Sequence, residues 1–64
     1  MKLTKGQIDV LKLLVTGLSC KQMEDKLNIT ESSIHNRLLG ARKANKCETN
    51  YKLLIKAERS GMLK

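Results

Sequence analysis

Between positions 30 and 46 the chain carries the side chains best suited to a recognition chemistry. On an α-helix with about 100° between residues, Ile34, Leu38 and Ala41 share a narrow apolar arc. Polar side chains fill the opposite arc, which is centred on Asn36. A DNA major groove about 12 Å wide admits one α-helix, whose outward side chains reach the base edges. The spacing therefore predicts a helix that reads bases in double-stranded DNA.

The predicted base-reading residues are Ser32, His35, Asn36 and Leu39. Asn36 can pair with adenine N6 and N7, and Ser32 can donate or accept a hydrogen bond. Leu39 fits a thymine methyl group, while an exposed leucine without a partner is the ordinary alternative. His35 is read either as a base or phosphate contact or as a surface histidine.

Cationic and capping residues around this segment are candidates for phosphate contacts. Arg37 and Arg42 flank the polar arc, a position closer to the DNA backbone than to the bases. The helix start at 30–33 offers free backbone N–H groups and the positive end of the helix dipole. The candidate phosphate contacts are Lys21, Thr30, Ser33, Arg37, Arg42, Lys43 and Lys46, with Lys5 and Lys12 as further cations.

These residues do not form a catalytic or metal-binding pattern in the sequence. His35 has a carboxylate and two hydroxyls nearby at 31–33, but all share one predicted helix and define no cleft. Cys20, Cys47 and a single histidine lack the spacing of a four-ligand zinc site, and a reducing cytoplasm argues against a disulfide. We therefore expect no enzyme activity, no cofactor and no metal, and expect both cysteines to be small core or boundary residues.

Charge and length narrow the class of protein further. Lys and Arg number 13 against 6 Asp and Glu, a net charge of +7 that is typical of nucleic-acid binding, with a solubilising surface as the alternative. One Tyr and no Phe or Trp leave few rings on which single-stranded bases could stack. The 64 residues predict one domain, 1–64. No apolar run approaches the roughly 18 residues of a membrane span, so we expect no membrane association and a cytoplasmic location.

Two helices are predicted ahead of the recognition segment. Thr4-x-x-Gln7 and Ser19-x-x-Gln22 fit capping boxes, in which a hydroxyl and an amide satisfy free backbone N–H groups. They predict helices over 4–16 and 19–28 that end at Gly17 and Asn28. The apolar series are Ile8, Leu11, Leu14 and Val15 in the first helix, and Cys20, Met23 and Leu27 in the second.

Two further helices complete the predicted fold. The short connection Asn28-Ile29-Thr30 leads into a third helix capped by Thr30, so the second and third helices form a helix-turn-helix. Gly40 within the third helix is either a tolerated weak position or a close approach to a ligand. A fourth helix runs from near Thr49 to Ser60-Gly61. We predict an all-α four-helix bundle.

Apolar positions on the fourth helix cover more than one core-facing stripe, so some should stay exposed unless a partner covers them. We predict that this helix is a C-terminal dimerisation helix, with contacts through Tyr51, Lys52, Leu54 and Ile55. A homodimer would place two recognition helices in successive major grooves.

A pattern of apolar, glycine and capping residues runs along most of the chain. It reads Leu3-Thr4, then Val10-Leu11-x-Leu13-Leu14-x-x-Gly17-Leu18-Ser19-x-Lys21-x-Met23, then Leu27-x-Ile29-Thr30-x-x-Ser33-Ile34. These stretches resemble the LuxR-type (GerE-like) DNA-binding domain. The resemblance implies a four-helix fold, a helix-turn-helix from helices two and three, and a fourth helix that commonly pairs protomers. It implies a small, stand-alone bacterial or phage transcriptional regulator.

The resemblance also assigns groove contacts to particular positions. The family's lysine that contacts bases and phosphates corresponds to His35, and the next groove contact corresponds to Asn36. A further position, often basic in the family, corresponds to Leu39, and the family's histidine corresponds to Arg37. The outward face therefore differs in chemistry from the family pattern, and no target DNA sequence carries over.

Other readings stay open because the chain departs from the family pattern. Gln7 replaces a glutamate and Ala44-Asn45 replace the usual Lys-Leu, which also fits a distant relative such as a sigma-factor region-four-like domain. The same fold could act as a protein-interaction module on RNA polymerase or another regulator, through the apolar fourth helix. An accessory DNA-binding factor in packaging or recombination would share the DNA contact.

Overall fold

The structure, a computed structural model, describes residues 1–63. Within that range the chain forms no strand and four helices, which are α1 (Lys5–Val15), α2 (Cys20–Leu27), α3 (Glu31–Ala44) and α4 (Asn50–Arg59). The molecule measures 27 × 21 × 18 Å along its principal axes. The prediction of an all-α fold of four helices is confirmed.

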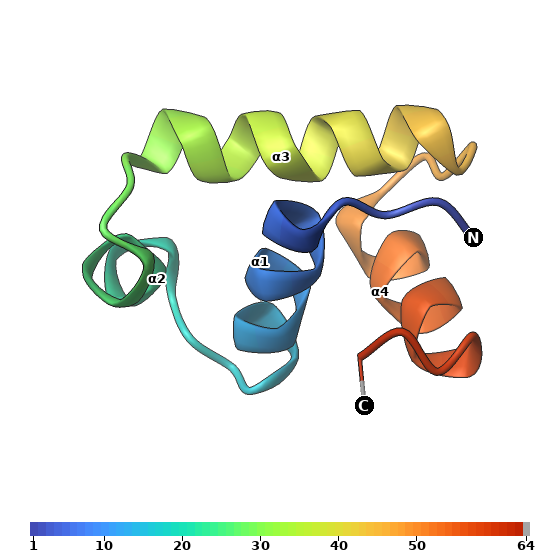
Figure 1. Ribbon diagram of the computed structural model, residues 1–64, viewed down its shortest axis with the longest axis horizontal. Helices are drawn as coiled ribbons and strands as arrows, with labels where there is room; N and C mark the ends of the chain where they lie inside the picture. The colour runs from blue at the N-terminus through green and yellow to red at the C-terminus, as the bar shows by residue number, and fades with distance from the viewer. Residues whose placement is uncertain (64) are drawn as a thin grey trace.

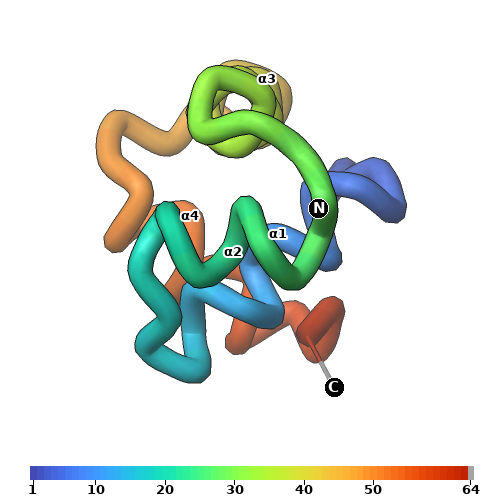
Figure 2. Tube along the Cα trace, turned by 90° about the vertical axis from the view of Figure 1, so that its left-hand side faces the viewer, coloured from blue at the N-terminus to red at the C-terminus, as the bar shows by residue number. Residues whose placement is uncertain are grey.

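The helix α3 forms one layer of the molecule and the other helices form the second. It lies across α1, α2 and α4 and packs against each of them (Figure 1). In the view turned by 90°, α3 is seen end-on, with the other helices gathered on one side of it (Figure 2). One long side of α3 is consequently left facing away from the rest of the molecule.

The predicted capping residues begin the helices. Thr4 and Ser19 each accept a hydrogen bond from the backbone N–H three residues later, and Gln7 and Gln22 complete both capping boxes. Thr30 accepts from the backbone N–H of Ser33 in the same way, and Thr49 caps α4. Local side chains therefore satisfy backbone donors that would otherwise be free at each helix start.

Residues with a left-handed backbone follow the helix ends. Gly17 and Gly61 have φ values of +87° and +79°, and Asn28 has φ 54°, as the sequence predicts. At the end of α3, however, the residue with φ 54° is Lys46. The N–H of Cys47 then donates to the Arg42 carbonyl at 2.9 Å, which is the bond that closes a Schellman motif.

The core lies between the two layers. The helix α3 contributes its predicted apolar arc, which consists of Ile34, Leu38 and Ala41. The other helices contribute the remaining buried apolar residues, Val10, Leu11, Met23, Leu53 and Ala57. In α1 the inward face is centred on Val10 and Leu11. The expectation that Val15 shares this face is wrong, because Val15 is the last residue of α1 and remains 40% exposed.

Both cysteines have free thiols, and both are partly buried against the core, as expected of boundary residues. Among residues 1–63, no helix is sufficiently long and apolar to cross a membrane.

A buried polar side chain, Asn45, ties the N-terminal segment to the end of α3. Its Oδ1 accepts a hydrogen bond from the Lys2 N–H at 2.8 Å, and its Nδ2 donates to the Lys2 carbonyl at 2.7 Å and to the Ala41 carbonyl at 2.9 Å. The Asn45 carbonyl accepts from Lys56 Nζ of α4 at 3.1 Å. One residue therefore joins the N-terminus, α3 and α4.

Candidate nucleic-acid interface

The side of α3 that faces away from the other helices carries Ser32, Asn36 and Leu39 of the predicted base-reading residues, and His35 lies at its edge, toward α2. These residues and one cation are exposed, and we call them the outer face of α3: Ser32, His35, Asn36, Leu39 and Lys43. Leu39 is 40% exposed. Among the described residues of α3, it is the one large apolar side chain that is exposed. Because Ile34, Leu38 and Ala41 anchor the opposite side in the core, the orientation of the outer face is fixed by packing.

A short turn of three residues, 28–30, joins α2 to α3. Asn28, in its left-handed conformation, ends α2, and the partly buried Ile29 packs against the core. Thr30 then starts α3. Since a three-residue turn joins the helices and the middle residue is anchored, α2 and α3 form one unit.

Carboxylates surround the start of α3, where the sequence placed phosphate candidates. Thr30 and Ser33 use their hydroxyls and an N–H group in the helix cap. A shallow hollow beside them is lined by Glu24, Asp25, Asn28, Ile29, Thr30 and Glu31. A phosphate at this helix start would meet negative charge, which opposes the attraction of the helix dipole.

Both arginine candidates are held within the molecule. The Arg37 guanidinium lies over α1, with Nη1 3.5 Å from the Gly6 carbonyl oxygen. A side chain at position 6 would place its Cβ 2.9 Å from that nitrogen, so glycine leaves the space that Arg37 fills. Arg42 Nη1 donates to the Glu48 carbonyl at 3.2 Å. Both residues are partly buried, which limits their reach toward a phosphate.

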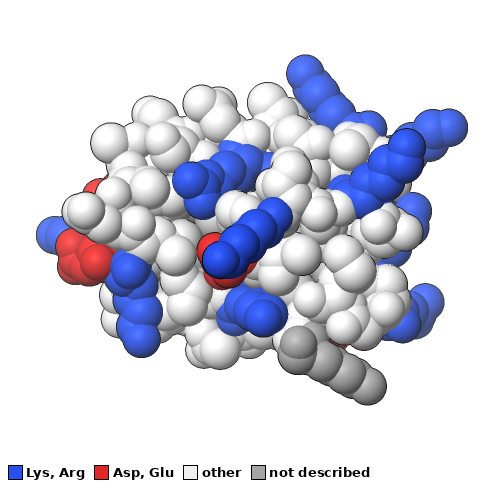
Figure 3. Space-filling view, in the orientation of Figure 1, with Lys and Arg blue, Asp and Glu red and all other residues white. Residues whose placement is uncertain are grey.

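The lysine candidates remain exposed. Lys43 lies in the last turn of α3, Lys46 follows the C-cap residue Asn45, and Lys21 lies in the first turn of α2. Figure 3 shows Lys and Arg side chains projecting over the C-terminal half of α3, whereas the carboxylates at the left-hand end lie toward α2. Positive charge is therefore concentrated beside the C-terminal half of α3.

The structure adds one cation that the sequence analysis missed. The backbone of Lys2 is hydrogen-bonded to Asn45, so the exposed Lys2 lies beside the C-terminal end of α3. The two residues are 43 positions apart. No sequence signal could have paired them, because Asn45 resembles any polar residue after a helix.

Gly40 lies close to another helix, α1. A Cβ added at Gly40 would lie 3.3 Å from Nε2 of Gln7, the residue that completes the capping box of α1. The close approach is thus to a side chain of the protein itself, and the predicted approach to a ligand stays a prediction.

The predicted dimerisation residues do not share one exposed surface. Tyr51 is 72% exposed, and Lys52 is exposed and forms an ion pair with Glu48 at 3.5 Å. Leu54 packs against the core, and Ile55 is partly buried. Among these residues, Tyr51 offers the largest accessible apolar side chain for a partner.

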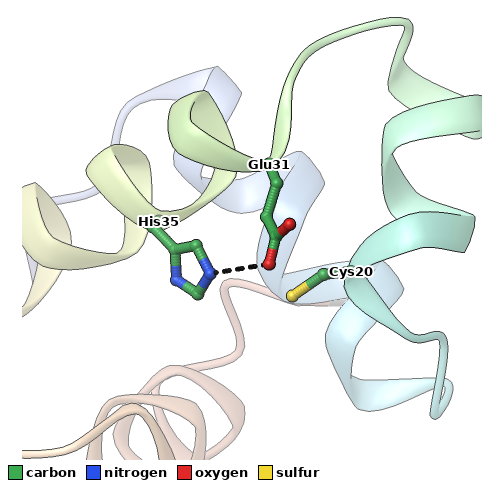
Figure 4. A group of neighbouring side chains, drawn as sticks. All are labelled: Cys20, Glu31 and His35. Atoms are coloured by element: carbon green, nitrogen blue, oxygen red, sulfur yellow. Dashed lines mark hydrogen bonds and ion pairs between the residues drawn. The ribbon is translucent and has the colours of Figure 1, made fainter.

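The structure also brings Cys20 of α2 together with the pair Glu31–His35 of α3. Cys20, Glu31 and His35 point toward one another across the α2–α3 unit (Figure 4). His35 is thus both a residue of the outer face and a member of this group.

Comparisons of the chain with protein-family models, with curated proteins and with solved structures find no match.

Proposed function

We propose that this protein is a small transcriptional regulator that binds double-stranded DNA by inserting α3 into the major groove. The observation that carries the proposal is the exposed, largely polar outer face of α3, presented by a helix whose opposite side is buried in the core. Such a helix fits a major groove, and its side chains can reach base edges. The resemblance to the LuxR-type domain supports the same function. The proposed activity is binding alone, in the cytoplasm of a bacterial or phage-infected cell.

Base reading is assigned to the middle of the outer face and phosphate binding to its C-terminal end. Asn36 is exposed there, and its side chain can make a bidentate contact with adenine. Lys43, Lys46 and Lys2 surround the C-terminal end of α3, so the DNA backbone would run past this end. Lys46 supports this assignment, because a lysine occupies a left-handed position in which glycine would be less strained.

A binding selection from a random DNA duplex library tests the proposal directly. We expect an enriched inverted repeat that binds far more tightly than its scrambled control. If about six phosphates are neutralised, log K should fall with log salt at a slope near −5. Steep salt dependence without any enriched sequence would contradict sequence-specific reading.

Two substitutions on the same face separate base reading from phosphate binding. Asn36→Ala should cost about 1–3 kcal/mol at the selected site and relax the sequence preference there. Lys43→Ala should weaken binding to selected and scrambled DNA alike and reduce the salt slope by about 1. Both side chains are exposed, so the fold should be unaffected. Equal losses on both DNAs for Asn36→Ala would refute its assigned role.

We further propose a homodimer formed through α4, with Tyr51 as the main contact. A tyrosine that is 72% exposed next to the partly buried Ile55 supplies accessible apolar surface. Sedimentation should detect a dimer that Tyr51→Glu converts to a monomer, while Lys12→Glu, at an exposed position of α1, leaves the dimer intact. A wild-type monomer at high concentration, with and without DNA, would exclude this arrangement.

The exposure of Tyr51 also favours a second candidate function, a contact between α4 and RNA polymerase or another regulator. A protein that binds no DNA in the selection and shows saturable binding to purified polymerase, lost with Tyr51→Glu, would support it.

A further inference from the structure

The geometry points to a binding site for one divalent transition-metal ion, of the Zn²⁺ class, formed by Cys20, Glu31 and His35. One ligand atom from each residue, the Cys20 Sγ, a Glu31 carboxylate oxygen and a His35 ring nitrogen, lies within 4.8 Å of the other two. The site joins the first turn of α2 to the first turns of α3 (Figure 4). It does not depend on the proposed DNA binding.

The distances fit the edges of a tetrahedral coordination site. His35 Nε2 and Glu31 Oε1 are 3.4 Å apart. Around a tetrahedral zinc ion with its usual bond lengths, nitrogen and oxygen ligands are separated by about 3.3 Å, and sulfur lies about 3.5 Å from either. The histidine and the carboxylate are therefore already spaced as ligands. The Cys20 sulfur lies within 4.8 Å of both other atoms, so it needs to approach each by about 1.3 Å at most, which rotation about its Cα–Cβ bond can supply.

The positions in the fold suit a metal site as well. Glu31 and His35 are four residues apart on α3, so both project from the same side of one helix. The same spacing places two histidines on one zinc ion in H-E-x-x-H helices. Cys20 comes from the other helix of the unit and is partly buried.

Local charge favours a cation at this end of the molecule despite the net charge of +7. Glu31 belongs both to the proposed site and to the hollow that Glu24 and Asp25 also line. The carboxylates attract a divalent cation, while Lys43, the one lysine of the α3 outer face, lies toward the opposite end of that helix, and Lys21 is the exposed cation next to Cys20.

The three ligand types, thiolate, imidazole and carboxylate, determine which metal ions the site prefers. Thiolate and imidazole ligands favour zinc and similar transition metals, whereas Mg²⁺ and Ca²⁺ prefer oxygen ligands alone. On binding, the Cys20 thiol loses its proton to solvent and the sulfur donates an electron pair to the metal. Three protein ligands leave the fourth tetrahedral position to water or to a donor from another molecule.

Co²⁺ titration of the full 64-residue chain, without DNA and under a non-coordinating phosphine reductant, tests the site. We expect one Co²⁺ per chain, with a sulfur-to-cobalt charge-transfer absorption that Zn²⁺ abolishes by displacement and Mg²⁺ leaves unchanged. Cys20→Ser should eliminate the absorption, and Cys47→Ser, the matched control with the other free thiol, should retain it.

His35→Asn and Glu31→Gln extend the test to the other two ligands. Each should weaken Co²⁺ binding by at least about 10- to 100-fold, since loss of groups that merely support a metal ligand has that effect. Circular dichroism of the metal-free variants should match the wild type, because both side chains are exposed, 58% for His35 and 60% for Glu31.

A thermal measurement gives a second, independent readout. A ligand that binds only the folded state raises its stability, so Zn²⁺ should raise the unfolding midpoint of the wild type and of Cys47→Ser but not of Cys20→Ser. Absence of the charge-transfer absorption, its loss with Cys47→Ser, one metal per two chains, or unchanged affinity with His35→Asn would each overturn the proposal.

Discussion

At the level of single residues, Lys46 combines a strained backbone with an exposed charge. Its φ of 54° lies in the left-handed region, which costs an L-residue about 1–2 kcal/mol. The corresponding residues after α1 and α4 are glycines. A glycine at position 46 would remove the strain but would lose more conformational entropy on folding. The strain is therefore a cost to stability that accompanies a cation beside the proposed interface.

We predict that Lys46→Gly stabilises the protein by about 0.5–1 kcal/mol, because relief of strain exceeds the added entropy cost. Lys43→Gly removes the same charge from inside α3 and should destabilise by up to about 1 kcal/mol. Urea unfolding of both variants measures the two free energies. Destabilisation by Lys46→Gly would contradict the argument from backbone strain.

At the level of elements, the contact between α1 and α3 depends on a glycine facing a capping residue. The Gln7 side chain accepts a hydrogen bond from the Thr4 N–H at 3.0 Å, which holds it in place. Its amide nitrogen would lie 3.3 Å from a Cβ at Gly40. The cap of one helix thus limits the side chain that the other helix can carry.

We predict an energetic coupling between these two positions. Alanine at position 40 should gain nearly the full helix-propensity difference of about 1 kcal/mol when Gln7 is also replaced by alanine. With Gln7 present, the gain should be smaller, since the amide must shift to admit the new methyl group. A double-mutant cycle measured by thermal unfolding gives the coupling energy. Equal effects of Gly40→Ala in both backgrounds would show that Gln7 moves without cost.

At the level of the whole molecule, Asn45 supplies the polar connection between segments far apart in the sequence. The residue is 7% exposed, its side chain hydrogen-bonds to the backbone N–H and carbonyl of Lys2, and its own carbonyl accepts from Lys56 Nζ. A chain of this size has a small core, so the loss of a buried network removes a large part of its stability.

We predict that Asn45→Asp lowers the free energy of unfolding by about 1–3 kcal/mol or more. An aspartate cannot donate to the Lys2 and Ala41 carbonyls and would face them with a negative charge. Asn36→Asp makes the same chemical change at an exposed site on α3 and should have little effect. Denaturant unfolding compares the two; similar stabilities would argue against a structural role for Asn45.

The sequence alone determined the helices, their starts and the buried arc of α3, because these depend on interactions within a few residues. Thr4, Ser19 and Thr30 each cap a helix through a backbone N–H three positions away, so type and spacing predict the bond. The helical spacing of apolar and polar residues on α3 likewise predicts which side is exposed. The outer face, and with it the proposed base-reading residues, could therefore be located without a structure.

Only the tertiary structure decided which side chains remain available for a partner and which contact one another. The side chain of Arg37 is chemically suited to contact a phosphate, but its guanidinium lies over Gly6, 31 residues away in the chain. Cys20 and the pair Glu31–His35 come together only because the turn at 28–30 folds α2 against α3. Helical periodicity sets the side of a helix on which a residue lies. The partner opposite it depends on how the helices pack, and that packing is settled by the whole core at once.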